Sequence, residues 1–240
     1  MEIPLSALDA LPENQFREFA EYADAAGLKI HACGDMLPDG LPITGPHVNA
    51  TQLHGYLTHA LGRARQLGVQ VVALDAARAR AVDPDGDFPF AWRQLGNFLR
   101  LCQGHARDCG ITVALLPLRK ADCSLLNLVS EATLIAGLLQ LSNIAVAAHT
   151  GHMAMASEPL SALRRAAPLL RHVYIENTLS RALPRPDDGE DHGRLLDLLD
   201  DIGYTGGVTL SGTITGGFAK DALNALNGIR ATLAERRVTF

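Results

Sequence analysis

The chain has 240 residues, of which 48% are hydrophobic, and a formal net charge of −5 at pH 7. This length and composition predict a single domain over residues 1–240 with a sizeable apolar core. The absence of a basic block or a long apolar run argues against nucleic acid or a membrane as a partner. The N-terminus does not resemble a signal peptide, and the four cysteines lack CxxC spacing, so we expect a cytoplasmic protein.

A helical pattern, a glycine and a β-rich apolar run recur along the chain, at Gly27, Gly68, Gly110 and Gly203. Glycine there permits the left-handed conformation that ends a helix. The strands that we expect are Glu2–Leu5, Leu28–Cys33, Val69–Leu74, Ile111–Leu116, Ile144–Ala148, His172–Glu176 and Gly207–Leu210. The helices that we expect are Asn14–Ala26, Thr51–Leu67, Trp92–Asp108, Val129–Leu141, Leu160–Leu169, Arg194–Ile202 and Lys220–Glu235. This alternation predicts parallel βαβ units whose strands are covered on both faces.

A doubly wound sheet and a (β/α) barrel of the TIM type both fit this pattern. No GxGxxG or GxxxxGK[ST] motif follows the first strand, which weakens the nucleotide-binding sheet. Long polar loops follow three strands, at Gly34–Asn49, Asp75–Phe90 and Asn177–Gly193. Because the loops after the strands form the active site of a TIM barrel, this pattern favours an α/β barrel of that type.

The segment HVYIENTLSRALP, residues 172–184, contains the most polar strand. Alternate side chains share a face on a strand, so His172, Tyr174 and Glu176 point the same way. Buried polar groups need partners, and we interpret the three as the wall of a polar pocket. A half-exposed strand with hydrogen-bonded side chains is the alternative.

Five motifs occur in order along the chain: GITVALLPL (110–118), LNLVSEA (126–132), AHTGHM (148–153), HVYIENTLSRALP (172–184) and GYTGGVTLSG (203–212). Together they resemble the xylose-isomerase-like TIM barrels, which include sugar-phosphate isomerases and epimerases and hydroxypyruvate isomerase. The resemblance covers nearly the whole chain. It implies a barrel that acts on small polar carbonyl or hydroxylated substrates.

In that family a divalent metal sits at four strand ends, typically on Glu, Asp, His or Gln, and Glu. The resemblance places these four positions at Leu116, His149, Tyr174 and Ser211. Leucine has no donor atom, and serine and neutral tyrosine are poor ligands, so His149 is the one good donor left. Both glutamates, which also serve as acid and base in many relatives, are absent. We therefore expect a divergent member that holds no metal.

A full TIM barrel has eight strands, whereas seven βα units are counted here. By the resemblance, Met1 lies just before the family's second strand, and Glu2 stands where relatives often have glutamate. We expect a barrel without the first β-strand and α-helix unit, whose open strand edges must be covered or paired. The closure could come from a seven-strand barrel, the N-terminal segment or a second subunit.

His149 and His152 stand three residues apart at a strand end. Imidazoles suit proton transfer near neutral pH, so we expect these two to act as acid and base, with Glu176 orienting one of them. A rebuilt Zn²⁺ site on His149, His152 and Glu176 is one alternative, and a pair of structural histidines is another.

Arg181 lies in a loop and suits a carboxylate or phosphate through its forked donors, or a surface salt bridge. The other residues that we expect at the substrate are Tyr174, His172, Asn127 and Glu2. Asp75 ends the third strand, and Arg78 or Arg80 matches an arginine that relatives carry there.

These expectations combine into a metal-independent sugar isomerase or epimerase that works by acid–base proton transfer, as isomerisation, epimerisation or elimination. The alternative is a pseudoenzyme that acts as a binding module or as the partner subunit of a metal-competent relative. The expected partners are a small-molecule substrate and either further copies of the chain or such a relative.

Overall fold

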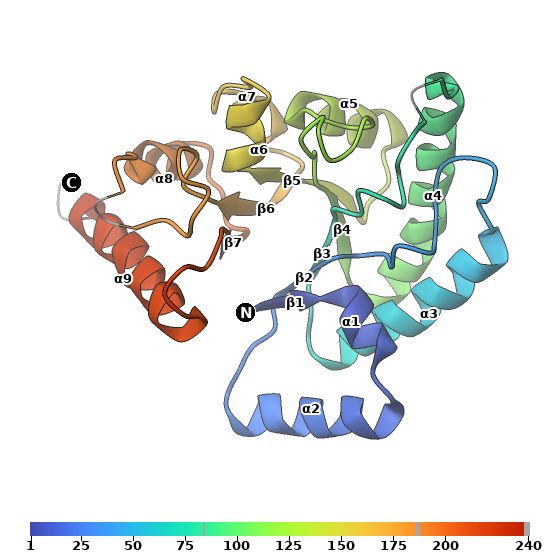
Figure 1. Cartoon of the computed structure of the whole chain (residues 1–240), viewed down its shortest axis with the longest axis horizontal. Coiled ribbons are helices and arrows are strands. Elements are labelled where there is room, and N and C mark those ends of the chain that lie inside the picture. The colour runs from blue at the N-terminus through green and yellow to red at the C-terminus, as the bar shows by residue number, and fades with distance from the viewer. Residues whose placement is uncertain (84, 186–187, 238–240) are drawn as a thin grey trace.

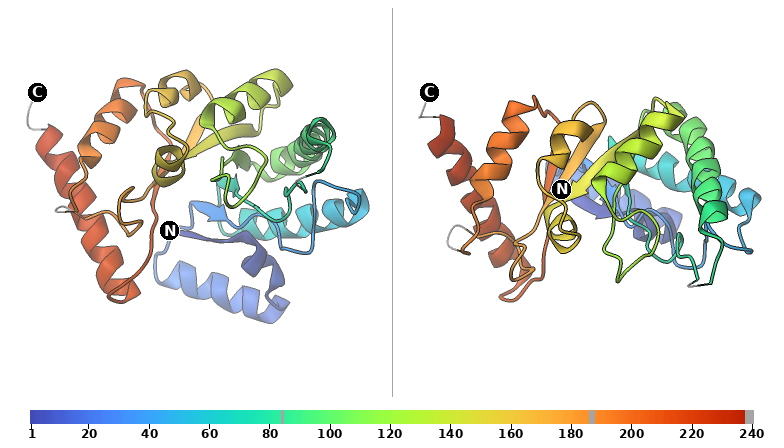
Figure 2. Two further views of the ribbon diagram at one scale, coloured as in Figure 1. Left: turned by 45° about the horizontal axis from the view of Figure 1, so that its top comes forward. Right: turned by 90° about the horizontal axis from the view of Figure 1, so that it is seen from above.

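The computed structural model describes residues 1–83, 85–185 and 188–237, and within them seven parallel strands form one sheet in the order β1 to β7. The strands are β1 (Glu2–Pro4), β2 (Ala32–Gly34), β3 (Val71–Leu74), β4 (Thr112–Leu115), β5 (Ile144–His149), β6 (Leu170–Ile175) and β7 (Gly207–Leu210). The sheet curls into a nearly closed barrel with helices around its outside (Figures 1 and 2), which confirms the TIM-type α/β fold.

The helices follow the strands and cover their outer faces (Figure 1). They are α1 (Leu5–Ala10), α2 (Glu13–Ala25), α3 (Ala50–Gln66), α4 (Phe88–Cys109), α5 (Val129–Leu139), α6 (Thr150–Met155), α7 (Ala162–Ala166), α8 (His192–Asp201) and α9 (Phe218–Arg237). No helix in the described part of the chain is both long and apolar enough to cross a membrane.

Local sequence sets the ends of these elements. The Asn49 side chain accepts hydrogen bonds from the first backbone amides of α3, and Asp87 does the same for α4. The glycines at 27, 68, 110 and 203 have φ between 64° and 76°, as the repeated pattern predicts. β3 and β5 are buried along their whole length, because helices cover one face and the barrel interior the other.

The predicted strands are all present, β7 with the predicted ends and the others with shifted ends, whereas the helices differ more. The short helices α1 and α6 were not predicted, since six residues are too few to show a helical period. The expected helix Leu160–Leu169 shrinks to α7, which ends at Ala166, and Pro168 shortly after it has no backbone N–H to continue the helix. β6 begins at Leu170 and ends at Ile175, so Glu176 lies just beyond the strand.

The barrel has a seam between its first and last strands. β1 and β7 are the two ends of the sheet and are not paired with each other in the described residues. Side chains cross this seam: Glu2 accepts hydrogen bonds from the hydroxyls of Tyr174 on β6 and Thr209 on β7. Seven strands with one seam is the arrangement expected for a barrel without its first βα unit.

Candidate functional site

Four aromatic rings form a row across the ends of β5 and β6. His149 ends β5 and stacks on His152 of α6, with ring centroids 4.0 Å apart and planes inclined by 10°. The Tyr174 ring also stacks on His149, with ring centroids 5.6 Å apart and planes inclined by 15°. His172 meets Tyr174 edge-on at 4.8 Å, as their shared strand face predicts. The structure thus brings both predicted histidines together at the carboxyl ends of the strands, where TIM barrels have their active sites.

His149 is buried, and its surroundings disfavour the protonated form of its ring. Burial lowers its pKa to about 3, and the neighbouring His152 acts in the same direction. The Ser211 hydroxyl lies 3.3 Å from its Nε2, while its Nδ1 is buried without a partner. His149 is therefore a neutral imidazole at pH 7, and its Nδ1 has no hydrogen-bond partner among the residues that the structure describes.

His152 has a defined tautomer. Its Nδ1 lies 3.0 Å from the backbone carbonyl oxygen of Pro117, which can only accept, so Nδ1 carries the proton. This leaves the lone pair on Nε2. Burial lowers the pKa of His152 and outweighs the opposing effect of the Pro117 bond, so the ring is a neutral base at pH 7.

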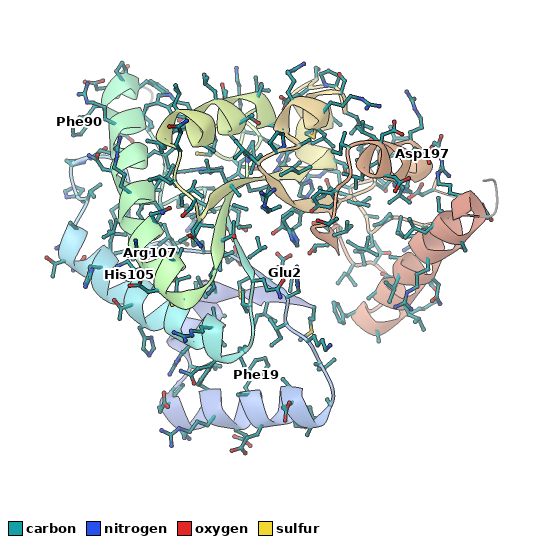
Figure 3. All side chains as sticks on the ribbon, turned by 180° about the vertical axis from the view of Figure 1, so that it is seen from behind. Glu2, Phe19, Phe90, His105, Arg107 and Asp197 are labelled. Atoms are coloured by element: carbon teal, nitrogen blue, oxygen red, sulfur yellow. The ribbon has the colours of Figure 1, made fainter. Side chains whose placement is uncertain are left out.

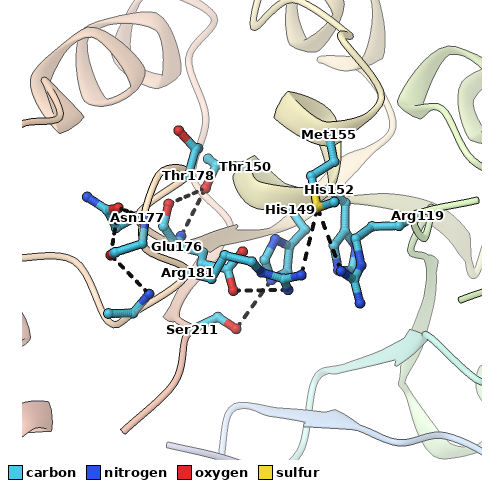
Figure 4. Close-up of polar contacts among 12 residues, drawn as sticks. Arg119, His149, Thr150, His152, Met155, Glu176, Asn177, Thr178, Arg181 and Ser211 are labelled. Atoms are coloured by element: carbon cyan, nitrogen blue, oxygen red, sulfur yellow. Dashed lines mark hydrogen bonds and ion pairs between the residues drawn. The ribbon is translucent and has the colours of Figure 1, made fainter. Parts of the chain in front are cut away.

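Glu176 adds a buried carboxylate beside the rings, and it bonds to Arg181 rather than to either histidine. Its Oε1 accepts a long hydrogen bond of 3.4 Å from Arg181 Nη2, and its Oε2 is buried without a partner. Only a glycine fits next to this carboxylate, since a Cβ on Gly151 would lie 1.8 Å from Oε2 and 3.3 Å from Cε1 of His149. The Glu176 carboxylate and the His149 ring therefore lie close together, both next to the Cα of Gly151 (Figure 4).

Arg181 is held at this position by its loop. Its backbone adopts a left-handed φ of 59°, which is uncommon for a residue other than glycine. The buried Asn177 maintains the turn, because its Oδ1 accepts from the backbone amides of Leu179 and Ser180. A backbone bond from Thr213 to the Arg181 carbonyl ties the loop to the segment after β7. Such local strain is typical of functional loops.

A second arginine, Arg119, reaches the same place and was not predicted. It pairs with Asp122 through two hydrogen bonds of 2.6 Å, and its Nη1 lies 3.7 Å from the Met155 sulfur (Figure 4). Arg181 Nη1 lies at the same distance from that sulfur. A signal for Arg119 was present in the sequence, since it directly follows the motif that ends at residue 118, in the loop after β4.

Glu2 links the seam to the row of rings. Its Oε1 accepts from the Tyr174 hydroxyl at 3.0 Å, and its Oε2 accepts from the Thr209 hydroxyl at 2.5 Å. His172 Nε2 lies 2.8 Å from Thr209 Oγ1 and 3.4 Å from Glu2 Oε2. Figure 3 shows Glu2 rising from β1 toward the centre of the barrel. Three of the expected substrate-binding residues thus form one internal network.

Two further polar groups occupy the barrel mouth near β3. The Asp75 carboxylate accepts from the backbone amides of Asp35 and Met36, and burial raises its pKa to about 6. The fully buried Arg80 donates to the carbonyl oxygens of Leu74 and Leu116, where β3 and β4 end. Asp75 is therefore an acid–base candidate beyond the expected set, whereas Arg80 maintains the strand ends.

Asn127 lies in the loop before α5. Its side-chain amide donates to the carbonyl oxygens of Leu118 and Cys123, both at 2.7 Å, and it is buried. Both amide hydrogens are thus used within the loop, so the visible role of Asn127 is to hold the loop that carries Arg119.

The residues present do not fit a metal of the kind that the resemblance implies. Leu116 has no donor atom, Ser211 faces His149, and the Tyr174 hydroxyl donates to Glu2. Within residues 1–83, 85–185 and 188–237, no group of three or more His, Cys, Asp or Glu side chains is arranged to hold a metal ion. The zinc alternative on His149, His152 and Glu176 has no geometric support either, since parallel stacked rings do not direct their nitrogens to one centre.

A cavity of about 870 Å³ opens at the seam, beside β7 and α9. Its polar lining includes Glu2, His172 and Ser211, but neither His149 nor His152. Apolar residues such as Val208 and Phe218 form another part of its wall and are exposed. The cavity lies between β1 and β7, the two end strands of the sheet, and is therefore separate from the stacked histidines.

The fold and the polar strand ends define the class of protein as an α/β barrel with its site at the carboxyl ends of the strands. The family model described as xylose isomerase-like TIM barrel matches residues 1–229, and the chain belongs to this family. A comparison with curated proteins gives no match.

Similar solved structures include three barrels at low identity. The apo form of 3-keto-D-glucoside 4-epimerase from E. coli has a TM-score of 0.78 at 20% identity, over 99% of this chain and 88% of that one. D-Psicose 3-epimerase from Clostridium cellulolyticum H10 has a TM-score of 0.78 at 19% identity, over 99% and 87%. An AP endonuclease of family 2 from Brucella melitensis has a TM-score of 0.73 at 18% identity, over 86% and 81%. At these identities the likeness establishes the shared fold.

Proposed function

We propose that this chain is a sugar isomerase or epimerase that transfers protons with its own side chains and without a metal ion. The observation that carries the proposal is the stacked pair of neutral imidazoles, His149 and His152, beside Arg181 at the strand ends. The epimerases among its structural neighbours support a substrate that is a small polar carbonyl or hydroxylated compound.

The tautomer of His152 assigns it the role of base. Its Nε2 lone pair takes a proton from the carbon next to a substrate carbonyl, so that a C–H bond breaks, an N–H bond forms and an enediolate results. A proton then moves from the remaining hydroxyl of the enediolate to the former carbonyl oxygen, and return of the first proton to the neighbouring carbon completes an isomerisation. Return of a proton to the opposite face, from a second acid such as Asp75, completes an epimerisation. Loss of a leaving group from the adjacent carbon instead gives an elimination.

His149 and Arg181 have the complementary role of stabilising the enediolate oxygen. A neutral imidazole can donate a hydrogen bond without transferring its proton, and the low pKa of His149 keeps it neutral. One well-placed donor to a developing oxyanion contributes about 10²–10³ in rate. Two such donors suit substrates whose C–H bond is already acidic, because they replace only part of what a divalent cation supplies.

The test is proton exchange, which does not require the substrate to be known in advance. A panel of ketoses, aldoses and sugar acids is incubated with the full chain in D₂O, and deuterium incorporation next to the carbonyl is followed by NMR. We expect His152→Ala to reduce exchange by about 10²- to 10⁴-fold without lowering the thermal midpoint. The matched control is His54→Ala, an exposed histidine on α3 outside the site, which should exchange like the wild type.

Metal dependence is measured on the same protein. We expect exchange to survive dialysis against EDTA and to be unchanged by added Mn²⁺, Mg²⁺ or Zn²⁺. Stoichiometric metal in the purified protein, together with loss of exchange after EDTA, would contradict the proposal.

A second candidate function is supported by the seam. The unpaired edges of β1 and β7 and the exposed apolar side chains Val208, Phe218 and Leu226 favour a partner subunit, either a second copy or a metal-competent relative. This pseudoenzyme alternative predicts no exchange with any substrate and a mass in solution above that of one chain. Light scattering after size-exclusion chromatography measures the mass, and a monomer that catalyses exchange excludes this candidate.

A further inference from the structure

Two arginines from different loops direct a donor to the same sulfur atom, that of Met155, close to the histidines (Figure 4). Arg119 Nη1 and Arg181 Nη1 each lie 3.7 Å from the sulfur of Met155, so the two nitrogens are separated by no more than twice that distance (Figure 4). A thioether sulfur is a weak acceptor. Each guanidinium thus keeps a donor that is poorly satisfied and is directed at the mouth.

Each arginine is also positioned by a carboxylate at its other nitrogens. Asp122 binds Nε and Nη2 of Arg119, and Glu176 binds Nη2 of Arg181. A planar guanidinium can hold one carboxylate on one edge and a second anion on another. The ion pairs therefore fix the arginines in orientation without using Nη1.

Both positive charges act on the proposed base and its neighbour. Arg119 and Arg181 each contribute to lowering the pKa of His149 and of His152, which places them close to both rings. The arginine side chains are 25% and 37% exposed, respectively. An anion could therefore reach them from solvent, while the reacting carbon lies over the histidines.

We infer that the substrate carries an oxyanion group, a carboxylate or a phosphate, which binds between Arg119 and Arg181 in place of the Met155 sulfur. The inference rests on the proposed function of the same site and narrows its substrates to sugar acids or phosphorylated sugars. Fixing the anionic end also positions the substrate, which is the part of catalysis that a metal-independent site needs most.

The test is a calorimetric titration of the full chain with inorganic phosphate and, separately, with gluconate. We expect Arg119→Gln and Arg181→Gln each to weaken the better of the two ligands by about tenfold or more, since one charge-assisted contact is lost. The matched control is Arg164→Gln, an exposed arginine on α7 that pairs with Asp201 and should bind within twofold of the wild type. Tighter phosphate binding indicates a phosphorylated sugar, and tighter gluconate binding indicates a sugar acid.

A second variant keeps the test valid if Arg119→Gln does not fold. Asp122→Asn removes a negative charge beside Arg119 but keeps one side-chain oxygen that can accept from the guanidinium, so it should tighten anion binding. Equal binding by all variants, or the absence of anion binding to the wild type, overturns the inference. These titrations need no turnover, so they remain interpretable if the proposed proton transfer fails. Conversely, proton exchange by Arg119→Gln that equals the wild type on a sugar acid or a phosphorylated sugar would refute the anion site and leave the proposed function intact.

Discussion

Glu2→Gln tests how much the seam depends on one side chain. The Glu2 carboxylate accepts hydroxyl hydrogen bonds from Tyr174 and Thr209 with its two oxygens, and its side chain is 18% exposed. Glutamine has the same shape but no charge, and its amide nitrogen cannot accept. Hydrogen bonds to charged groups contribute about 1.5–3 kcal/mol each, so we expect the free energy of unfolding to fall by about 2–3 kcal/mol at pH 7.

The same variant has a predicted pH dependence. Burial raises the pKa of Glu2, but hydrogen bonds from His172 and Thr209 outweigh it, and the pKa lies below the usual 4.5. A carboxyl group whose pKa is lower in the folded state stabilises the fold fully above its unfolded value. That contribution is lost as the pH falls through the folded value. The difference between wild type and Glu2→Gln should therefore shrink below about pH 4.5.

Urea unfolding followed by circular dichroism at pH 7 and at pH 3.5 measures both effects. Glu18→Gln is the matched control, because Glu18 is exposed on α2, and it should be within about 0.5 kcal/mol of the wild type. If Glu2→Gln is equally stable at pH 7, or if its deficit is the same at both values, the network does not close the seam.

Three further changes probe the barrel mouth. The Asp75 carboxyl should titrate near pH 6 by NMR. Because its pKa is raised in the folded state, the free energy of unfolding should fall as the pH rises toward 6. A titration midpoint near pH 4 would contradict this. Arg80→Met should destabilise the fold by about 3 kcal/mol in chemical unfolding, since two strand-end carbonyls lose their donor, and an unchanged value would exclude that role. Gly151→Ala should displace the Glu176 carboxylate and reduce exchange, whereas Gly104→Ala, whose Cβ has open space, should not. Equal activity of the two alanine variants would show that Glu176 need not stay in place.

The sequence was sufficient for the fold because its signal repeats. Each βα unit has an apolar strand and a helical pattern, and a glycine separates the helix from the next strand at four of the boundaries, so an error at one boundary leaves the others in place. What the sequence did not show was short or set by pairing. The helix α6 has only six residues, and the start of β2 at Ala32 is set by its register with β1. The residues of one strand alone do not determine which residues of a neighbouring strand they pair with.

The candidate site was predictable to the extent that strand geometry determines it. Alternation placed His172 and Tyr174 on one face, and the ends of β5 and β6 lie side by side, which brought His149 and His152 to Tyr174. Glu176 lies one residue beyond the end of β6, and its buried carboxylate bonds to Arg181 rather than to a histidine. Alternation could not indicate Arg119, because this arginine lies in the loop after β4, and the available signal was its place directly after the motif that ends at residue 118.

The row of rings and the seam are connected by a hydrogen bond between Tyr174 and Glu2. Tyr174 stands where the family resemblance places a metal ligand, yet its hydroxyl donates to Glu2, which is 172 residues away in the chain. The carboxylate is thus stabilised by hydroxyl donors from two strands on the far side of the seam. Because Tyr174 stacks on His149, and His149 on His152, the orientation of the proposed base depends on that bond. Opening the seam should therefore impair proton transfer even though Glu2 contacts neither histidine of the stacked pair.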